Sequence, residues 1–231
     1  TFKKVPKTTL QFYKVIKLIG KGSFGKVHLG IHLLTRKKVA IKCIDKQYIL
    51  EEKAQNKIIQ EVTILKGLSH RNIIKILEVF ENRKYVFIVT DYAAKGDLLQ
   101  FMKEHNIFRE SKARGIVSQI LNGLEYCHAR GIIHRDVKLD NVLLDKDFRV
   151  KLCDFGVSRY MPKNGSVKER CGTPAYIAPE IIKNQGYSGF LADVDNFVTL
   201  VLESRHFTLC HGHRDDSLQV QNSTSAPQAY R

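Results

Sequence analysis

The sequence predicts an α+β fold of two lobes, a small antiparallel-sheet lobe with one key helix followed by a mainly helical lobe. Five predicted strands form the first lobe: residues 12–20 alternate roughly as a strand should, and 27–33, 39–44, 73–80 and 85–90 follow as further strands, the last two as apolar runs. A single amphipathic helix is predicted at about 51–66, where apolar residues recur at three- and four-residue spacing. Residues 91–96 show little periodicity, so we place the boundary between the lobes there and expect helices at 97–104 and 111–130.

The composition indicates a globular chain with a basic surface. Hydrophobic residues make up 43% of the 231 residues, which is enough for folded lobes with real cores. The formal net charge of +15 favours phosphate-bearing or acidic partners and raises the hypothesis of nucleic-acid binding. Because no helix-turn-helix, zinc-finger or aromatic RNA-binding signature accompanies the charge, we favour dispersed lysines and do not expect a nucleic-acid partner.

The cysteines and the apolar runs bear on the compartment. The five cysteines are odd in number, widely spaced and without a CxxC pair, so we expect reduced thiols and an intracellular protein, cytoplasmic or nuclear. The first residues contain no apolar stretch of signal-peptide length, and no run reaches the roughly 18 apolar residues of a membrane span. We therefore expect no membrane association.

A glycine-rich loop, Gly20-Lys21-Gly22-Ser23-Phe24-Gly25-Lys26-Val27, joins the first two predicted strands. A dinucleotide-binding loop would open a helix instead, so that alternative is disfavoured. Glycines let the backbone lie close to phosphates, with its N–H groups free to donate. Taken alone, the motif is equally compatible with an ordinary glycine-rich hairpin.

Two charged residues lie in apolar surroundings. Lys42 falls inside the strand predicted at 39–44, and Glu61 lies beside the apolar stripe of the helix at 51–66. A lysine within a strand and a glutamate on a helix are most often solvent-facing. The functional alternative is that Lys42 grips phosphates and Glu61 is the ion-pair partner that holds it.

The segment His134–Asn141 places a carboxylate, an ammonium and an amide within six positions. Asp136 can orient an attacking hydroxyl and accept its proton, Lys138 can neutralise charge on a moving phosphoryl group, and Asn141 can hold Mg²⁺ through its amide oxygen. A polar turn is the alternative interpretation. Asp154-Phe155-Gly156 follows 13 residues after Asn141 and adds a second carboxylate suited to a metal. Together the two segments indicate phosphoryl transfer.

On these residues the chain resembles a eukaryotic protein kinase catalytic domain over about residues 10–194. The matching motifs occur in the family's order: Gly20–Val27, Val39-Ala40-Ile41-Lys42, Glu61, His134-Arg135-Asp136 through Asn141, Asp154-Phe155-Gly156 and Ala178-Pro179-Glu180. Lys138 and the run 172–176 are similar to the serine/threonine branch rather than the tyrosine-specific branch. The motif sequences as a whole most resemble those of calmodulin-dependent and AMP-activated-type kinases.

The resemblance implies the site and its cofactors, ATP and Mg²⁺. Asp136, Lys138, Lys42 and Glu61 are the implied catalytic residues, and Asn141 and Asp154 the metal ligands. The implied nucleotide-binding residues are Ile19, Gly20, Lys21, Gly22, Ser23, Phe24, Gly25, Lys26, Val27, Ala40, Lys42, Thr90 and Leu143.

The resemblance also bears on substrates and regulation. Asp97 and Asp140 fall where basophilic relatives carry carboxylates, so we expect protein substrates with Arg or Lys a few residues before the acceptor hydroxyl. Glu169 stands where AMP-activated-type relatives carry a phosphorylated threonine. We expect its permanent charge to order the loop through Arg135 without phosphorylation, and an exposed glutamate in a basic loop is the alternative.

The resemblance stops near Val194. Asp193-Val194 fits the start of a long buried helix, but Asp195 stands where relatives carry tryptophan, and 195–231 shows no further family motif. A partial helix remains possible, because Val194, Phe197, Val198 and Val201 keep a helical stripe. We expect an N-terminal extension at 1–11, an upper lobe at 12–92, an incomplete lower lobe at 93–194, and a divergent, partly disordered tail at 195–231.

An incomplete lower lobe has consequences for activity. It should expose apolar surface and leave Glu180 without a buried partner, which would lower stability and impair phosphate transfer. Two functions stay open: a serine/threonine protein kinase, and a catalytically inactive nucleotide-binding decoy or scaffold. We expect a monomer in either case. His206, Cys210, His211 and His213 cluster near the end, but their spacing matches no standard zinc finger.

Overall fold

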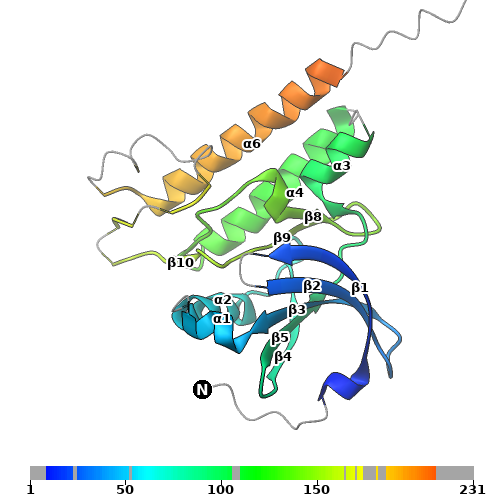
Figure 1. The fold of residues 1–231 in the computed structure, drawn as a ribbon. Coiled ribbons are helices and arrows are strands. Elements are labelled where there is room, and N and C mark those ends of the chain that lie inside the picture. The colour runs from blue at the N-terminus through cyan, green and yellow to red at the C-terminus, as the bar shows by residue number, and fades with distance from the viewer. Residues whose placement is uncertain are drawn as a thin grey trace, which may run out of the picture.

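The computed structural model describes residues 9–22, 25–51, 54–105, 110–163, 165–169, 171–173, 181 and 186–211. Within these ranges the chain forms the two predicted lobes, one built on a sheet and one mainly helical (Figure 1).

The upper lobe is a five-stranded antiparallel sheet in the order β1-β2-β3-β5-β4. A short 3-10 turn at Thr9–Phe12 precedes it, and its strands are β1 (Tyr13–Gly22), β2 (Gly25–His32), β3 (Lys38–Asp45), β4 (Ile76–Glu81) and β5 (Tyr85–Asp91). Two helices lie between β3 and β4, α1 (Lys46–Glu51) and α2 (Gln55–Gly67). All five strands and α2 were predicted from periodicity, whereas α1, only six residues long, was not.

Strand alternation divides the side chains of β3 between two faces. Val39 and Ile41 are buried and pack with Phe80, Phe87 and Val89 in the core of the sheet. Ala40 and Lys42 point the other way, toward the lower lobe. The apolar run that predicted the strand therefore has one face in the core and one face in the cleft between the lobes.

In its described residues, the lower lobe combines short strands with helices. Its strands are β6 (Gly96–Asp97), β7 (Ile132–Ile133), β8 (Val142–Leu144), β9 (Val150–Leu152) and β10 (Arg159–Tyr160), and its helices are α3 (Leu98–His105), α4 (Glu110–His128) and α6 (Gly189–His211). A 3-10 turn at Leu139–Asn141 leads into β8. Strands β6, β8 and β9 form one small antiparallel sheet, and β10 pairs with β7.

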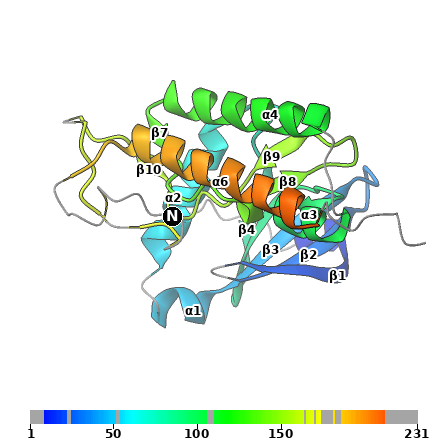
Figure 2. The same cartoon turned by 90° about the horizontal axis from the view of Figure 1, so that it is seen from above.

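One core joins these elements. Ile120 and Leu124 of α4 pack with Leu139, Leu152 and Phe155, all of them nearly or fully buried. Seen from above, α4 and α6 lie side by side over the small sheet (Figure 2). This packing places the loop 134–141, between β7 and β8, on the side of the lower lobe that faces the sheet of the upper lobe. The upper lobe is the one drawn at the bottom of Figure 1.

Helix α6 continues well past Val194, but its buried face differs from the predicted stripe. Phe197 and Val201 pack against the core as predicted, whereas Val194 and Val198 are 47% and 48% exposed. Asp193 is fully buried instead. Its carboxylate is held by backbone amides of the loop 134–141, and this contact sets the rotation of the helix about its axis. The disorder predicted beyond His211 lies outside the described residues.

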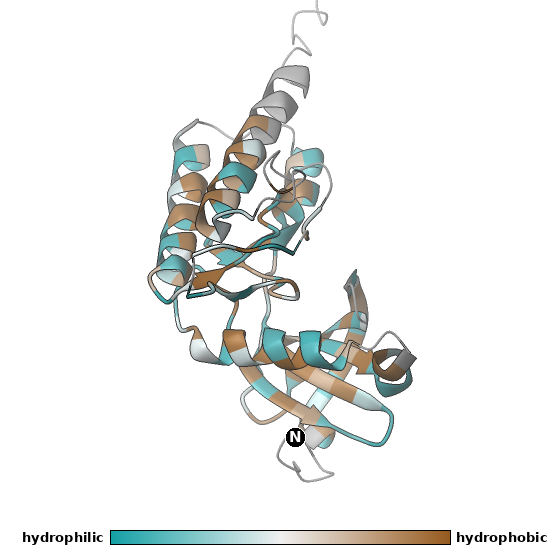
Figure 3. Cartoon of the chain, turned by 90° about the vertical axis from the view of Figure 1, so that its left-hand side faces the viewer, coloured by the Kyte–Doolittle hydropathy of each residue, from teal (hydrophilic) through white to brown (hydrophobic). Residues whose placement is uncertain are grey.

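Apolar side chains therefore remain at the surface of α6. Leu191 and Leu202 are 62% and 60% exposed, in addition to Val194 and Val198. Figure 3 shows hydrophobic residues along much of this helix. Within the described residues, these side chains form an exposed apolar surface on this helix.

Candidate active site

A cleft of about 560 Å³ lies between the lobes. Its apolar part comes from four strands of the upper lobe and from β8 of the lower lobe, through Ile19, Gly20, Lys21, Val27, Ala40, Thr90 and Leu143. Its polar end contains Lys42, Glu61, Asn141 and Asp154. An apolar slot that ends in charged groups is the shape expected of a nucleotide site, with the base in the slot and the phosphates at the polar end.

Lys42 and Glu61 form a buried ion pair across the upper lobe. The Lys42 Nζ lies 2.8 Å from Glu61 Oε1 and 3.1 Å from Oε2, and the side chains are 16% and 6% exposed. Burial lowers the pKa of Lys42, but the charge of Glu61 and its hydrogen bond outweigh burial and raise the pKa above its usual value. The lysine therefore stays charged in the cleft, with Glu61 as the partner that the sequence suggested.

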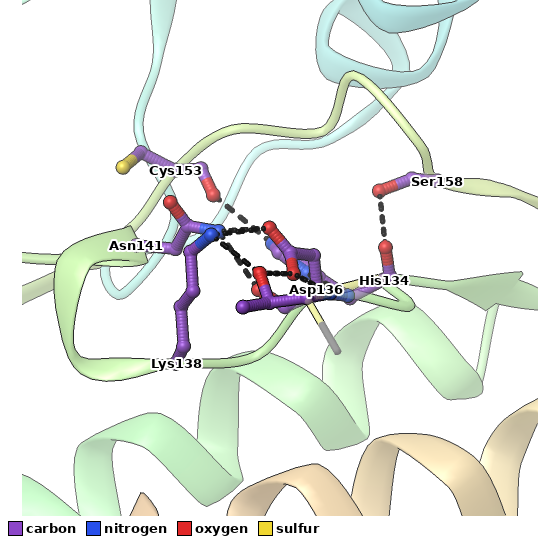
Figure 4. Close-up of polar contacts among 7 residues, drawn as sticks. His134, Asp136, Lys138, Asn141, Cys153 and Ser158 are labelled. Atoms are coloured by element: carbon purple, nitrogen blue, oxygen red, sulfur yellow. Dashed lines mark hydrogen bonds and ion pairs between the residues drawn. The ribbon is translucent and has the colours of Figure 1, made fainter. Parts of the chain in front are cut away.

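The loop 134–141 brings three predicted catalytic groups together (Figure 4). Lys138 Nζ lies 3.0 Å from Asp136 Oδ2, and the Asn141 amide donates to the same oxygen at 2.9 Å. The other oxygen, Oδ1, accepts hydrogen bonds from the Thr173 backbone N–H at 3.0 Å and hydroxyl at 2.7 Å. Lys138 also donates to the Thr173 hydroxyl at 2.7 Å.

These contacts keep Asp136 ionised. Burial acts to raise the pKa of the Asp136 carboxyl, but the hydrogen bonds from Thr173, Lys138 and Asn141 together with the charge of Lys138 lower it below its usual range. An ionised carboxylate next to a hydroxyl is the arrangement a proton acceptor requires. Thr173 lies 37 residues along the chain, in the run 172–176 that resembles the serine/threonine branch, and the sequence did not predict this contact.

Asn141 and Asp154 are the residues suited to a divalent cation. The Asn141 amide nitrogen is occupied by Asp136, which leaves its oxygen as the available ligand, and Asp154 adds a carboxylate nearby on the cleft wall. The backbone N–H of Cys153 donates to the Asn141 carbonyl at 3.0 Å and ties the two segments together. Oxygen donors of this kind fit Mg²⁺. Among the described residues there is no cluster of three or more His, Cys, Asp or Glu side chains suited to a metal.

The loop 134–141 is held by Asp193, which lies near the start of α6. Its Oδ2 accepts the His134 backbone N–H at 2.8 Å and lies 2.8 Å from His128 Nε2, and its Oδ1 accepts the Arg135 N–H at 2.6 Å. His134 also contacts the Cys153 carbonyl at 3.0 Å and stacks edge-on against Phe155. The sequence identified Asp193 as a helix start but did not predict its role, because its partners lie about 60 positions away.

Part of the glycine loop lies at a depression outside the interlobe cleft. Strand alternation turns Lys26 toward the outer face of the sheet, where it lines a separate depression with Gly25 and His28. Gly25 and the Lys26 side chain are not among the residues that line the interlobe cleft. The sequence pattern covered the whole loop, whereas Gly20, Lys21 and Val27 are the described loop residues that line the cleft. Ser23 and Phe24, and the predicted motif 178–180, lie outside the described residues.

The predicted acidic pair lies at the mouth of the cleft. Asp97 and Asp140 both line it, and Asp140 is exposed. Asp97 Oδ1 accepts the backbone N–H of Gln100 at 2.7 Å, so this carboxylate also caps the first turn of α3.

Comparison with known proteins agrees with this geometry. The family model described as "Protein kinase domain" matches residues 13–224. A probable serine/threonine-protein kinase MARK-A of Dictyostelium discoideum is 40% identical over 190 residues, which cover 82% of this chain and 18% of the relative. A carbon catabolite-derepressing protein kinase of Candida glabrata is 39% identical over 182 residues, which cover 79% of this chain and 30% of the relative.

The chain belongs to the protein kinase family. The matched range continues past Val194, where the motifs recognisable in the sequence end. The chain spans less than a third of the length of these two curated relatives. In the described part of the chain, no helix has the length and apolar character needed to cross a membrane.

Proposed function

We propose that this chain transfers the γ-phosphate of ATP to serine or threonine hydroxyls of protein substrates. The observation that carries the proposal is the convergence on one cleft of Lys42, Asn141 and Asp154, which come from β3, the loop 134–141 and the residues after β9. The serine/threonine preference is supported by Lys138 in contact with Asp136 and Thr173, and by the names of both curated relatives.

The upper lobe holds the nucleotide. The base fits between Ala40 and Leu143, and the charged Lys42, held by Glu61, binds the phosphate oxygens at the inner end. Since the ammonium is already paired and oriented, little ordering is required when the nucleotide binds.

The lower lobe provides the groups around the acceptor. Asp136 accepts the hydrogen bond of the substrate hydroxyl and takes up its proton as the phosphoryl group moves. Lys138, 3.0 Å from Asp136, stabilises the negative charge that develops on the transferred group. Asn141 and Asp154 are positioned to hold Mg²⁺, which would neutralise the phosphate oxygens when bound.

Two finer points extend the proposal. Asp97 and Asp140, at the mouth of the cleft, favour substrates with Arg or Lys before the acceptor hydroxyl. We also assign the activity to the interior of the cell, cytoplasm or nucleus, because Cys43, Cys127, Cys153 and Cys171 are free thiols.

The test compares the chain with its Asp136→Asn variant, using a peptide with arginine before the acceptor serine and a peptide with glutamate there. We expect transfer to the basic peptide, a loss of at least about 100-fold in the variant, and slower transfer to the acidic peptide. ATP with Mg²⁺ should raise the melting temperature of both proteins, since Asp136 is not among the residues that line the nucleotide cleft.

The apolar residues exposed on α6 favour a second candidate, a nucleotide-binding module without transfer activity. Stabilisation by ATP without phosphate transfer would support that module and contradict the enzyme. Equal turnover of the two peptides would contradict the preference for basic substrates but not the transfer activity.

A further inference from the structure

The carboxylate of Glu169 lies between two arginines from different parts of the lower lobe. Its Oε2 forms a close ion pair with Arg159 Nη1 on β10, and it lies 3.8 Å from Arg135 Nη1, next to Asp136 in the loop 134–141. The hydrogen bond from Arg159 is the main reason why the pKa of Glu169 lies below its usual value, and both arginine charges add to it. The sequence suggested Arg135 as a partner but not Arg159.

Arg135 needs a nearby negative charge. Its side chain is only 11% exposed, and its Nη1 is buried without a hydrogen-bond partner among the described residues. Its Nε donates to the Val157 carbonyl at 2.6 Å, and its backbone adopts a left-handed φ of 68°. A buried guanidinium is destabilising unless an opposite charge offsets its lost hydration, and the Glu169 carboxylate lies 3.8 Å from this unpaired nitrogen.

Glu169 is itself anchored to the segment that leads into α6. The Tyr187 hydroxyl donates to the Glu169 carbonyl at 2.9 Å. Tyr187 and Val167 exchange backbone hydrogen bonds at 2.8 and 2.9 Å, and both residues are buried. Position 169 therefore connects three pieces of chain: its carboxylate contacts β10 and the loop 134–141, and its backbone carbonyl contacts the residues before α6.

We propose that Glu169 is a positioning residue: its fixed charge clamps the segment around residues 165–169 to Arg135 and Arg159 and so helps to hold Thr173 and Asp136 in contact without phosphorylation at this position. Ordering of such segments by a phosphate paired with arginine is a general mechanism, and a carboxylate can make the same contact with less charge. The inference rests on the proposed function for its effect on catalysis, but the clamp can be measured without catalysis.

The first test measures amide hydrogen exchange of Val167 and Tyr187 in Glu169→Gln. Because Glu169 is 60% exposed, the clamp should be worth no more than a surface ion pair, and we expect exchange about fivefold faster than in the unaltered chain. Glu125→Gln, on the exposed side of α4, is the matched control and should leave both amides unchanged. Equal exchange in Glu169→Gln and Glu125→Gln would overturn the proposal.

A second variant checks that the arginine is the partner. Arg159→Gln should speed exchange by no more than Glu169→Gln does, because the contact with Arg135 remains. The double variant should add little to the effect of Glu169→Gln, which already removes both contacts. Additive effects would contradict the clamp. Phosphatase treatment of the unaltered chain should leave exchange as it was, and a marked increase would show that a phosphate rather than Glu169 orders the segment.

The catalytic readout separates positioning from general destabilisation. In Glu169→Gln we expect kcat to fall about fivefold while KM for ATP stays constant, because Glu169 is absent from the residues lining the cleft. A parallel loss of ATP binding would indicate a merely structural role and would overturn the assignment. If the unaltered chain transfers no phosphate, the proposed function fails, while the exchange measurements still decide the clamp.

Discussion

The Lys42 ammonium and the Glu61 carboxylate are the clearest case in which one residue depends on another. Burying either charge alone would be destabilising. In the structure they form an ion pair at the inner end of the cleft, with Lys42 Nζ 2.8 Å from Glu61 Oε1. The sequence left two interpretations open for both residues, because a lysine within a strand and a glutamate on a helix are most often solvent-facing. The structure shows the ion pair, across 19 positions of the chain.

Glu61→Gln should therefore destabilise the upper lobe. It leaves Lys42 charged and largely buried with a neutral partner, and we expect the free energy of unfolding to fall by about 3 kcal/mol. Urea denaturation with an unchanged slope would measure this loss. Affinity for ATP should fall as well, since the ammonium is no longer oriented.

Glu81→Gln is the control for this change. Glu81 pairs with Lys46 at 2.9 Å, but both side chains are about one-third exposed, and such pairs are worth less than about 1 kcal/mol. Equal losses in the two variants would show that burial of the Lys42–Glu61 pair makes no difference to stability.

At the scale of elements, the residues of the glycine loop have different surroundings although one motif predicted the same role for all of them. The motif predicted that the loop borders phosphates, and Gly20 and Val27 do line the cleft. Gly25 serves another purpose: a Cβ at this position would collide with the backbone carbonyl oxygen of Cys43 on β3. Its small size allows β2 to approach β3 closely at this point.

Gly25→Ala should accordingly disrupt the pairing of β2 with β3. Because the obstructing atom belongs to the backbone, the strand must shift, and we expect a loss of about 2 kcal/mol in the free energy of unfolding. Gly20→Ala meets nothing within 4 Å and should change stability by less than about 1 kcal/mol. Thermal melting of the two variants without nucleotide would compare them, and equal melting temperatures would show that β2 can relax.

Helix α6 illustrates a second limit of element-level prediction. Its apolar spacing predicted a helical stripe, but the structure turns Val194 and Val198 outward and buries Asp193 and Asn196. Periodicity places residues relative to one another on a helix but does not set the rotation of the helix against its neighbours. Here the rotation follows from hydrogen bonds that Asp193 makes to a distant loop.

At the scale of the whole molecule, Asp193 joins elements that the chain order keeps apart. It contacts His128 at the end of α4 and the amides of His134 and Arg135, while the loop that carries those amides faces the upper lobe. A buried carboxylate with three donors is strongly stabilised, so α6 supports the catalytic loop even though much of its outer face is exposed.

Asp193→Asn should uncouple α6 from the loop. An amide NH₂ would face at least one backbone N–H, and we expect a loss of about 2 kcal/mol in stability together with much slower phosphate transfer. Asp195→Asn, at an exposed position on the same helix, should change stability by less than about 0.5 kcal/mol. Chemical denaturation and the peptide assay would measure both, and unchanged transfer in Asp193→Asn would show that the loop is positioned from elsewhere.

The sequence by itself determined the family and the two-lobed order of strands and helices, and it predicted Lys42, Asp136, Asn141 and Asp154 as groups of the site. Periodicity, glycine spacing and motif chemistry are local properties, so they can be recognised before the chain is folded. Only the tertiary structure decided the rotation of α6, the outward placement of Lys26, and the contacts of Asp136 with Thr173 and of Glu169 with Arg159. These features depend on which surfaces meet after folding, and no spacing within one segment encodes that meeting.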